Sequence, residues 1–205
     1  MRQPVSIFKL VLPLILFVFS ASIFAQSDPV LKADPSFDVT LNVLAGSNDV
    51  SQKGELPASF ASITRQLKGS FGYASYRLVN TYIGRIGNNG SIKYQSVANN
   101  FGADPQERPV FLDWELQGLR NIASTDTASA FQIQGFRFGA KVPIRTSSGV
   151  DANGKAVSVF NYESIGLNVN RMSINQGRPV LIGTMELPQT SGTMFLVLSV
   201  TPVEN

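Results

Sequence analysis

Two carboxylates, Asp113 and Glu115, form the most enzyme-like pair in the sequence. They lie in "RPVFLDWELQGLR", where apolar and polar residues alternate as they do in a β-strand. Alternate residues of a strand point to the same face, which would place the two backbone positions about 6.5–7 Å apart. That separation suits glycoside hydrolysis by a pair of acids. The same alternation is also typical of a solvated face opposite a buried one, and this interpretation explains every residue of the segment.

Histidine and cysteine are both absent from the 205 residues. Histidine is the commonest general base near neutral pH and the commonest metal ligand. Ser-His-Asp and Cys-His hydrolases, histidine-ligated zinc sites and thiol redox chemistry are therefore excluded. We expect no catalytic residue, no cofactor and no metal ion.

Two other patterns could bind a ligand. The segment "DANGK" (151–155) has the Asp, Asn and Gly of a calcium loop, but Phe160 stands where that loop needs a glutamate. A tight Asn-Gly turn is the better interpretation. Aromatic residues could form a stacking platform for a glycan or another flat ligand, or could belong to a β-rich core: Tyr73, Tyr76, Tyr82, Tyr94 and Trp114.

The first 25 residues predict export. Arg2 and Lys9 precede an apolar run of about 15 residues, and small residues lead to Ala25. The run is short for a membrane span, which needs about 20 apolar residues, and Pro13 interrupts it. We expect cleavage after Ala25, with retention as an anchor as the alternative. No transmembrane span is expected after cleavage, and the protein is expected in the periplasm, outside the cell or in the cell envelope.

The charge balance excludes nucleic acid as a partner. The chain has 17 basic and 14 acidic residues, and the loss of Arg2 and Lys9 leaves 15 against 14. The remaining basic residues are spaced singly, whereas a nucleic-acid surface requires clustered Lys and Arg.

The rest of the chain predicts an exposed arm over residues 26–36 and a single β-rich domain over residues 37–205. One amphipathic helix is expected at about residues 57–68, where apolar residues recur at helical spacing, with Gly69 as a left-handed cap. This helix is expected to pack on the chain's own sheet. The residues of its apolar stripe are Leu56, Phe60, Ile63 and Leu67.

Short strands fill the remainder. The turn "GNNG" (87–90) predicts a hairpin between the strands on either side of it. Gly135 switches the alternation of its strand, as a bulge would, and residues 147–157 have the composition of a loop. The predicted fold class is therefore α+β and β-rich: an antiparallel sheet or sandwich with one amphipathic helix.

The segment "MFLVLSV" (194–200) is apolar at six of seven positions, so both of its faces must be covered. We expect a central strand of the chain's own sandwich, with an edge strand completed by a neighbouring molecule as the alternative. In the second case the candidate interface residues are Met194, Leu196, Leu198, Val200, Val180 and Ile182.

Residues 160–205 resemble the terminal β-hairpins of bacterial secretins, the outer-membrane channels of export machines. The family's lip segment is absent, and "PQTSG" stands in its place. The resemblance implies a β-module of the envelope that assembles. Residues 56–81 resemble a segment of uncharacterised exported bacterial proteins, which implies no mechanism. The secretin-like positions are Tyr162, Gly166, Leu167, Val169, Gly177, Val180, Gly183 and the strand 196–202.

Together these observations favour an exported, non-enzymatic envelope protein that acts in structural assembly or protein–protein interaction. Its partner would be another copy of the chain or another envelope protein. The alternative is a periplasmic or extracellular domain that binds a small ligand or a glycan. An unfamiliar hydrolase that uses Asp113 and Glu115 is the third hypothesis.

Overall fold

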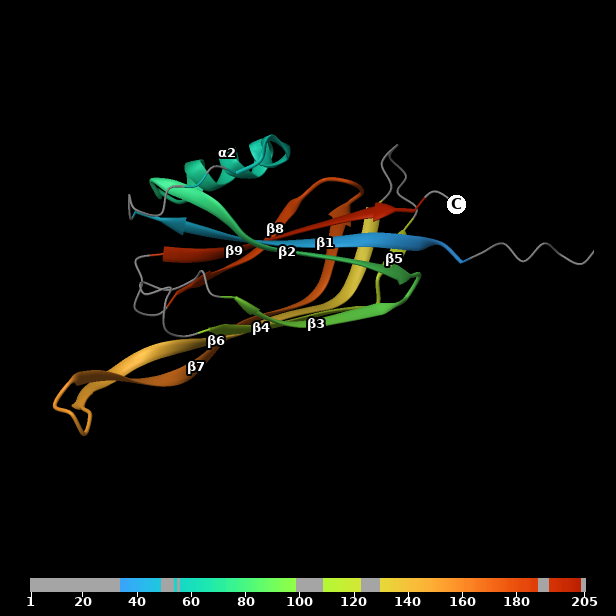
Figure 1. The fold of residues 1–205 in the computed structure, drawn as a ribbon. Coiled ribbons are helices and arrows are strands. Elements are labelled where there is room, and N and C mark those ends of the chain that lie inside the picture. Colours follow the sequence, from blue (N-terminus) through green and yellow to red (C-terminus); the bar gives the residue numbers. More distant parts are fainter. Residues whose placement is uncertain are drawn as a thin grey trace, which may run out of the picture. The chain divides into compact units, whose positions relative to one another are not determined.

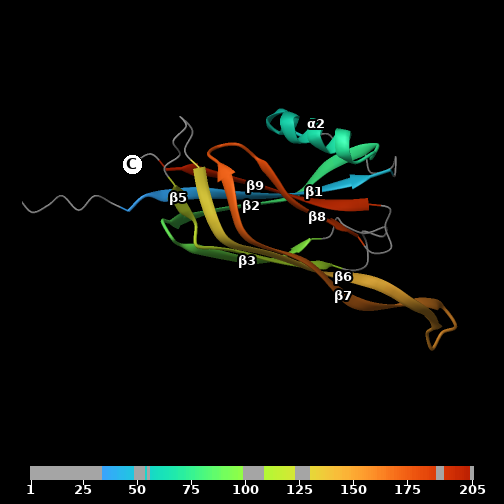
Figure 2. The same cartoon turned by 180° about the vertical axis from the view of Figure 1, so that it is seen from behind.

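The computed structural model describes residues 34–48, 54, 56–98, 109–122, 130–187 and 192–203. These residues form two antiparallel β-sheets that face each other, with one short α-helix on the outside of the first (Figures 1 and 2). Sheet A has the strand order β2-β1-β9-β8. Sheet B has the order β3-β4-β6-β5, and β7 pairs with β6. This arrangement confirms the predicted β-rich α+β sandwich.

The elements have the following bounds: β1 Ser36–Ser47, η3 Ala58–Phe60, α2 Ala61–Ser70, β2 Ser75–Gly87, β3 Ser91–Ala98, β4 Val110–Gln117, β5 Arg120–Ile122, β6 Ala130–Val150, β7 Ala156–Asn175, β8 Val180–Glu186 and β9 Gly192–Pro202. The predicted signal peptide and most of the predicted arm lie outside the described residues. Ser36, the last residue of that arm, already pairs with Gly87 in sheet A. Among the helices of the described ranges, none has the length and apolar character needed to cross a membrane.

Strict alternation along the strands builds the core between the sheets. In β1, the side chains of Phe37, Val39 and Leu41 are fully buried at alternate positions. In β4, Leu112 and Trp114 are buried in the same way, as the sequence predicted. Residues of a strand that face one side meet the inward residues of the opposite sheet, so each sheet presents one apolar face to the core.

Strand β9 is the central apolar strand that the sequence favoured. It pairs with β1 on one edge and with β8 on the other. Leu196 and Leu198 pack in the core between the sheets, whereas Phe195 and Val197 pack in the cluster that includes Ile63 and Leu67 of α2. The chain itself therefore covers both faces and both edges of this strand.

The helix is present with slightly different bounds from those predicted. A 3₁₀ turn at Ala58–Phe60 leads into α2, whose buried residues Ile63 and Leu67 pack with Phe195. The prediction that Gly69 caps the helix is wrong. Gly69 lies within the helix, and the C-cap is Phe71, which is extended with φ −131°. The Phe71 ring packs against Phe195 at a centroid distance of 4.9 Å, and the helix ends where Phe71 becomes extended, two positions after the glycine.

The predicted hairpin between β2 and β3 is also wrong. The turn exists, because the Gly90 amide donates to the Gly87 carbonyl at 2.9 Å. However, β2 pairs with β1 in sheet A, and β3 pairs with β4 in sheet B. The turn therefore connects the two layers of the sandwich. Local turn chemistry cannot distinguish these outcomes, since both use the same four residues.

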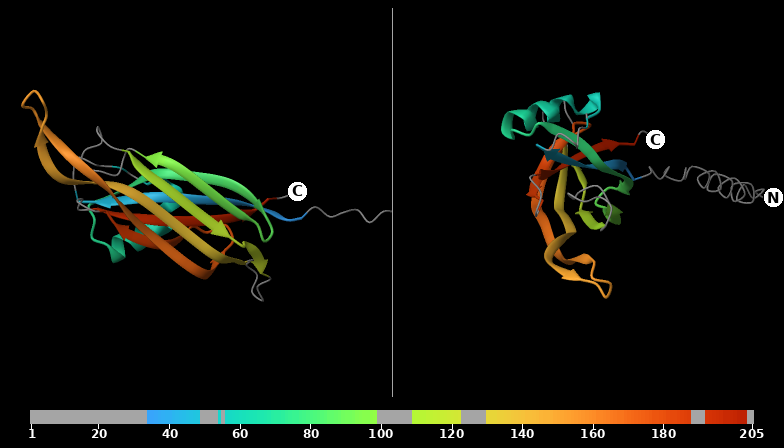
Figure 3. Two further views of the ribbon diagram at one scale, coloured as in Figure 1. Left: turned by 90° about the horizontal axis from the view of Figure 1, so that it is seen from below. Right: turned by 60° about the vertical axis from the view of Figure 1, so that its left-hand side comes forward.

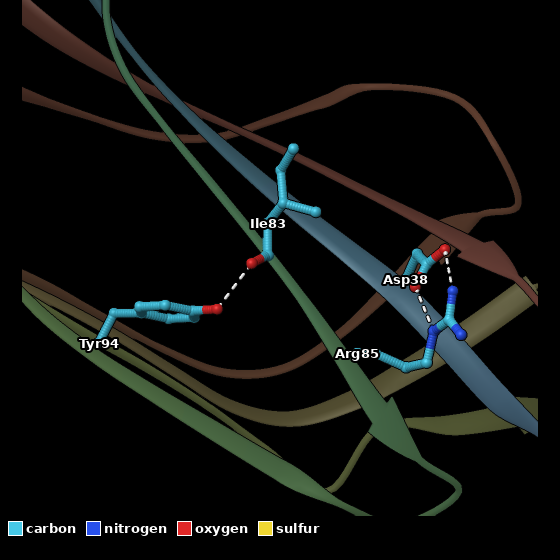
Figure 4. A network of polar contacts seen from close by, with 4 residues as sticks. All are labelled: Asp38, Ile83, Arg85 and Tyr94. Carbon is cyan, nitrogen blue, oxygen red and sulfur yellow. Dashed lines mark hydrogen bonds and ion pairs between the residues drawn. The ribbon is translucent and has the colours of Figure 1, made fainter.

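Side chains join the edges of the sheets near this turn. The Tyr94 hydroxyl of β3 donates to the Ile83 carbonyl of β2 at 2.6 Å, as Figure 4 shows. In the same view, Arg85 forms two hydrogen bonds with Asp38, at 2.8 and 3.2 Å. These hydrogen bonds lower the pKa of the Asp38 carboxyl. The contacts fasten β2 both to its neighbour within sheet A and to sheet B.

The phase switch predicted near Gly135 is present and extends across sheet B. Ile133 and Phe136 are both buried, although three positions separate them. At the same level, Gly118 follows β4 with φ +63° and Arg171 of β7 has φ +53°. A left-handed residue within a strand reverses the faces of the residues that follow it. The sheet bends here, and β6 and β7 curve together towards sheet A (Figure 2).

The far ends of β6 and β7 form a long hairpin. Strand β4 pairs with β6 only as far as Lys141, whereas β7 pairs with β6 as far as Val150. Residues 147–157, predicted as a loop, are therefore mostly strand, and the turn is confined to 151–155. The Asp151 carboxylate closes it by accepting from the amides of Asn153 and Lys155, each at 2.9 Å. The predicted tight turn at this site is confirmed.

Candidate binding site on the outer face of sheet B

The outer face of sheet B carries the side chains that alternate with those of the core. Its four main strands, β3, β4, β6 and β7, lie side by side in the left view of Figure 3. Helix α2 lies on the opposite side of the sandwich, over sheet A (Figures 1 and 2). Polar residues dominate the outer face because the apolar positions of the same strands point into the core.

A hollow of about 1070 Å³ lies on this outer face. We call it the outer groove. Its lining comes from all four strands: residues 95–97, 111–113, 137–141 and 162–168. Pockets for small molecules typically measure about 300–1,000 Å³, so the outer groove has room for an extended ligand.

Two glycines form the floor of the outer groove. Ladder pairing places Gln95, Asp113, Gly139 and Gly166 in one row across the sheet. A Cβ added at Gly139 would lie 2.6 Å from Asp113 Oδ1, and one added at Gly166 would lie 2.8 Å from the Phe138 carbonyl oxygen. The absence of both side chains keeps the floor at the level of the backbone.

An ion pair lies beside this floor. Arg137 of β6 donates from Nη2 to Asp113 Oδ2 of β4 at 2.9 Å. The side chains are about half and one-third exposed, so the pair faces the solvent that fills the groove. The next row beyond the glycines contains Arg137 and Asn168, which pair across β6 and β7. Planar groups with fixed hydrogen-bond directions therefore gather at this end.

An exposed aromatic pair forms the other end of the outer groove. The rings of Phe111 and Tyr162 have centroids 5.6 Å apart at an angle of 55°. They are 44% and 41% exposed, unlike the buried rings of the core. The Tyr162 hydroxyl donates to the Pro109 carbonyl at 3.2 Å and so fixes the direction of its ring. Lys141 shares the row of Phe111 and gives the groove one positive charge in excess.

The structure places Asp113 and Glu115 on this same outer face, as the sequence predicted, but gives them separate partners. Asp113 is held by Arg137, while Glu115 Oε1 accepts from Gln117 Nε2 at 2.6 Å. Asp113 lines the outer groove, whereas Glu115 lies in the row of Arg137 and does not contribute to the lining. The two carboxylates are thus engaged with neighbours on the sheet surface.

The aromatic platform suggested by the sequence does not form. Tyr76, Tyr82 and Trp114 are at most 7% exposed. Tyr73 and Tyr76 pack around Phe195 beneath the helix, whereas Tyr94 stacks on Trp114 at 5.3 Å within the sandwich. All five residues belong to the two apolar clusters or pack against them, so the interpretation as a ligand platform is wrong.

The candidate interface residues of the C-terminal strands lie inside the chain. Met194, Leu196, Leu198 and Val200 are each 0% exposed. Val180 of the edge strand β8 pairs with Leu198, and it packs against the core together with Ile182. In this conformation the β9 side chains are already covered by residues of their own chain.

Among the described residues, no group of three or more acidic, histidine or cysteine side chains lies close enough together to hold a metal ion. The outer groove itself has a single carboxylate, Asp113, and this carboxylate is already paired with a cation. The side chains that the outer groove offers to a ligand include the Asp113–Arg137 pair and the exposed rings of Phe111 and Tyr162.

The outer groove was not predicted from the sequence, although the strand phases of its residues could be recognised there. Phe111 and Tyr162 stand in polar phases of their strands, where an aromatic side chain must be exposed. Gly139 and Gly166 stand in the same phases, where they leave a gap. Aromatic residues and glycines at outward positions of a strand could have indicated a groove. The pairing of the strands, which brings these residues together, had to be known first.

No family model and no curated protein sequence matches this chain. Among solved structures, it is similar to the secretin InvG of the Salmonella SPI-1 type III secretion injectisome (residues 176 to the end, open gate state). The identity is 9% over 98% of this chain and 67% of that chain, with a TM-score of 0.34.

It is also similar to a chain of the Klebsiella pneumoniae type II secretion system outer membrane complex of PulD, PulS and the PulC HR domain. Here the identity is 11% over 95% of this chain, with a TM-score of 0.34, and this chain spans 43% of that one. Both neighbours are secretin structures, and the structural likeness of this chain to them is weak. At such scores the likeness assigns no role to this chain.

Proposed function

We propose that this chain is an exported, non-catalytic binding domain of the cell envelope, and that it holds its partner in the outer groove. The observation that carries this proposal is the exposed pair Phe111–Tyr162 beside the ion pair Asp113–Arg137. Apolar side chains that remain exposed to water on a mostly polar face, here the two rings with Val97 beside Phe111, are typical of a recognition surface.

The buried state of β9 supports the choice of this surface. The six apolar residues of "MFLVLSV" are all fully buried, so an interface built from them would require the sandwich to open. The outer groove requires no such change, since its side chains already face solvent. A preformed surface binds at a lower entropic cost than one that must first be exposed.

Binding without catalysis fits the residues of the outer groove. General acid–base work needs a group that can exchange a proton with the substrate. The sequence contains no histidine or cysteine, and the two candidate carboxylates are engaged with Arg137 and Gln117. Residues 1–25 predict export, and an exported protein would meet its partner in the cell envelope.

The proposal can be tested by sedimentation of the purified protein with cell envelopes isolated from the producing cells. We expect the wild-type protein to pellet with the envelopes and a Phe111→Ser, Tyr162→Ser double variant to bind at least about tenfold more weakly, since each ring removes apolar area from water on binding. Ile83→Ser is the matched control, because Ile83 is 66% exposed on β2 of sheet A. Equal binding by the double variant and the wild-type protein would contradict the proposal.

Structural assembly is the second candidate, and the β6–β7 hairpin is the observation that favours it. Val150, Val157 and Val159 are 71%, 46% and 46% exposed there, where β4 no longer pairs with β6. Exposed valines on a two-stranded ribbon suit contact with another copy or another envelope protein. Light scattering over a concentration series tests this candidate. An oligomer that dissociates in a Val157→Ser, Val159→Ser variant would support it, and a monomer at every concentration would contradict self-assembly.

A further inference from the structure

We infer that the partner held in the outer groove is a polysaccharide chain, recognised through its hydroxyl groups and through the apolar faces of its rings. This inference rests on the proposed function, because it names the partner of the same site. It follows from three properties of the groove: its exposed rings, its planar polar groups and its position on a sheet face.

The exposed rings suit a sugar. A pyranose ring has one face of C–H groups, which carry a slight positive charge, and the face of an aromatic ring is negative. Phe111 and Tyr162 lie 5.6 Å apart at 55°, so the two rings present differently inclined surfaces. Successive sugar rings of a polysaccharide are also inclined to one another, which allows each aromatic ring to contact a separate sugar.

The polar groups suit hydroxyls. A hydroxyl both donates and accepts, whereas a guanidinium only donates and a carboxylate only accepts. Asp113 and Arg137 lie 2.9 Å apart and can therefore serve the two sides of one hydroxyl or of two adjacent ones. Because this pair balances its own charge, recognition requires no net charge on the partner. Two side-chain amides lie beside this pair: Gln95 is in the row of Asp113, and Asn168 is in the row of Arg137.

The position on a sheet face argues against a peptide. Sheets usually bind extended peptides at a free edge, where unpaired backbone groups receive the peptide backbone. The floor residues Gly139 and Gly166 belong to ladders, and Gly139 has a partner on both sides, Asp113 and Gly166. A peptide on this face would have to satisfy its backbone groups with side chains alone. A polysaccharide has no backbone amide ladder to satisfy, so side chains are sufficient.

The size of the outer groove fits the same partner. Its volume of about 1070 Å³ is spread over four strands, and its lining runs from the aromatic pair across the glycine floor to Asn168. A chain of sugar rings could lie across the strands in contact with both ends at once. The side chains that bind it are fixed in advance by the Asp113–Arg137 pair and by the Tyr162–Pro109 hydrogen bond. Such preorganisation lowers the entropic cost of binding.

The test compares envelopes that have been depleted of one component at a time. Samples are digested exhaustively with proteinase K, or extracted with chloroform–methanol to remove lipid, and washed before the protein is added. We expect wild-type binding to survive both treatments, and to be competed by polysaccharide extracted from the same envelopes. Loss of binding after proteinase treatment, or after lipid extraction, would overturn this inference and indicate a protein or a lipid partner.

Variants keep this test separate from the test of the proposed function. Tyr162→Phe and Phe111→Tyr retain a ring and should bind within about threefold of wild type, whereas Tyr162→Ser should bind about tenfold more weakly to the protein-free and lipid-free samples. Arg137→Gln, like Tyr162→Ser, should bind these samples more weakly than the wild-type protein does. If untreated envelopes bind the Phe111→Ser, Tyr162→Ser variant as well as wild type, the proposed function fails. If the variants discriminate only before proteinase treatment, the polysaccharide inference alone fails.

Discussion

The carboxylate of Asp113 lies over Gly139, its partner in the neighbouring strand β6. The two residues pair across the β4–β6 ladder, and a Cβ added at Gly139 would lie 2.6 Å from Asp113 Oδ1. The position of the carboxylate, and with it the ion pair to Arg137, therefore depends on the absence of a side chain at residue 139. A backbone position thus determines the hydrogen-bonding geometry of the outer groove.

Gly139→Ala is expected to displace the Asp113 carboxylate and to weaken envelope binding, because no Cβ lies 2.6 Å from an oxygen without a shift. We expect about a threefold to tenfold loss of affinity, the size of one weakened hydrogen bond. Sedimentation with envelopes measures this loss. Gly135→Ala is the control on the same strand, since its added Cβ would meet Gln117 at an ordinary 3.7 Å. Equal binding by both variants would show that the carboxylate position is unimportant.

Removal of residues 193–205 is expected to unfold the protein. Six apolar residues of β9 are 0% exposed, and burial of each contributes about 1.5–3 kcal/mol, against a typical total stability of about 5–15 kcal/mol. Circular dichroism and denaturant titration check this outcome, with a chain that ends at Val203 as the control. A truncated protein that still unfolds cooperatively and has lost only an oligomeric state would contradict it and restore β9 as an interface.

Gly118→Ala is expected to lower the free energy of unfolding by about 1–2 kcal/mol, the cost of a left-handed conformation for a residue with a side chain. Gly118 has φ +63°, and an added Cβ would also lie 2.5 Å from the Gln134 side chain. Urea denaturation measures the change. Gly149→Ala serves as the comparison, because Gly149 lies in β6 without a positive φ and an added Cβ there meets nothing within 4 Å. A loss of similar size at both positions would argue against strain at Gly118.

The protein is expected to lose stability at alkaline pH through Tyr76 and Tyr82. Burial raises the pKa of both phenols in the folded state. A raised pKa means that the stabilisation is complete below the unfolded-state tyrosine pKa of about 10 and is lost as the pH rises through the folded-state values. Tyrosinate absorbance and circular dichroism recorded together against pH should change in step at the alkaline end.

Tyr82→Phe provides the comparison for the alkaline transition. It retains the ring but removes the hydroxyl, which hydrogen-bonds to Ser96 and Asn80. The variant should show a smaller loss of stability above pH about 10 than the wild-type protein, because one of the two phenols no longer ionises on unfolding. An unchanged alkaline transition would remove Tyr82 from the explanation.

Local patterns were sufficient for most of the elements. The alternation of Phe37, Val39 and Leu41 predicted β1, and the spacing of Phe60, Ile63 and Leu67 predicted the helix. Each prediction needed only residues that are near in sequence, because the period of the side chains follows directly from the local backbone geometry. The phase switch at Gly135 could be predicted for the same reason.

Pairing could not be predicted in this way. The turn at 87–90 has the composition of a hairpin turn, but its two strands enter different sheets. Strand β2 pairs with β1, and β3 pairs with β4. The site has the same origin. Phe111 and Tyr162 are 51 positions apart in the chain, and they meet only because β4 and β7 lie on either side of β6.

The sequence by itself determined the class of fold, the expectation of export, the absence of histidine and cysteine chemistry, and the need to cover both faces of "MFLVLSV". These conclusions follow from composition and from short-range periodicity. The tertiary structure alone decided that β9 is covered by its own chain, that the tyrosines around Trp114 are core, and that two glycines and two exposed rings form one groove. Strand order and register bring together residues that are distant in the chain, and they depend on the free energy of the whole sandwich rather than on any single segment.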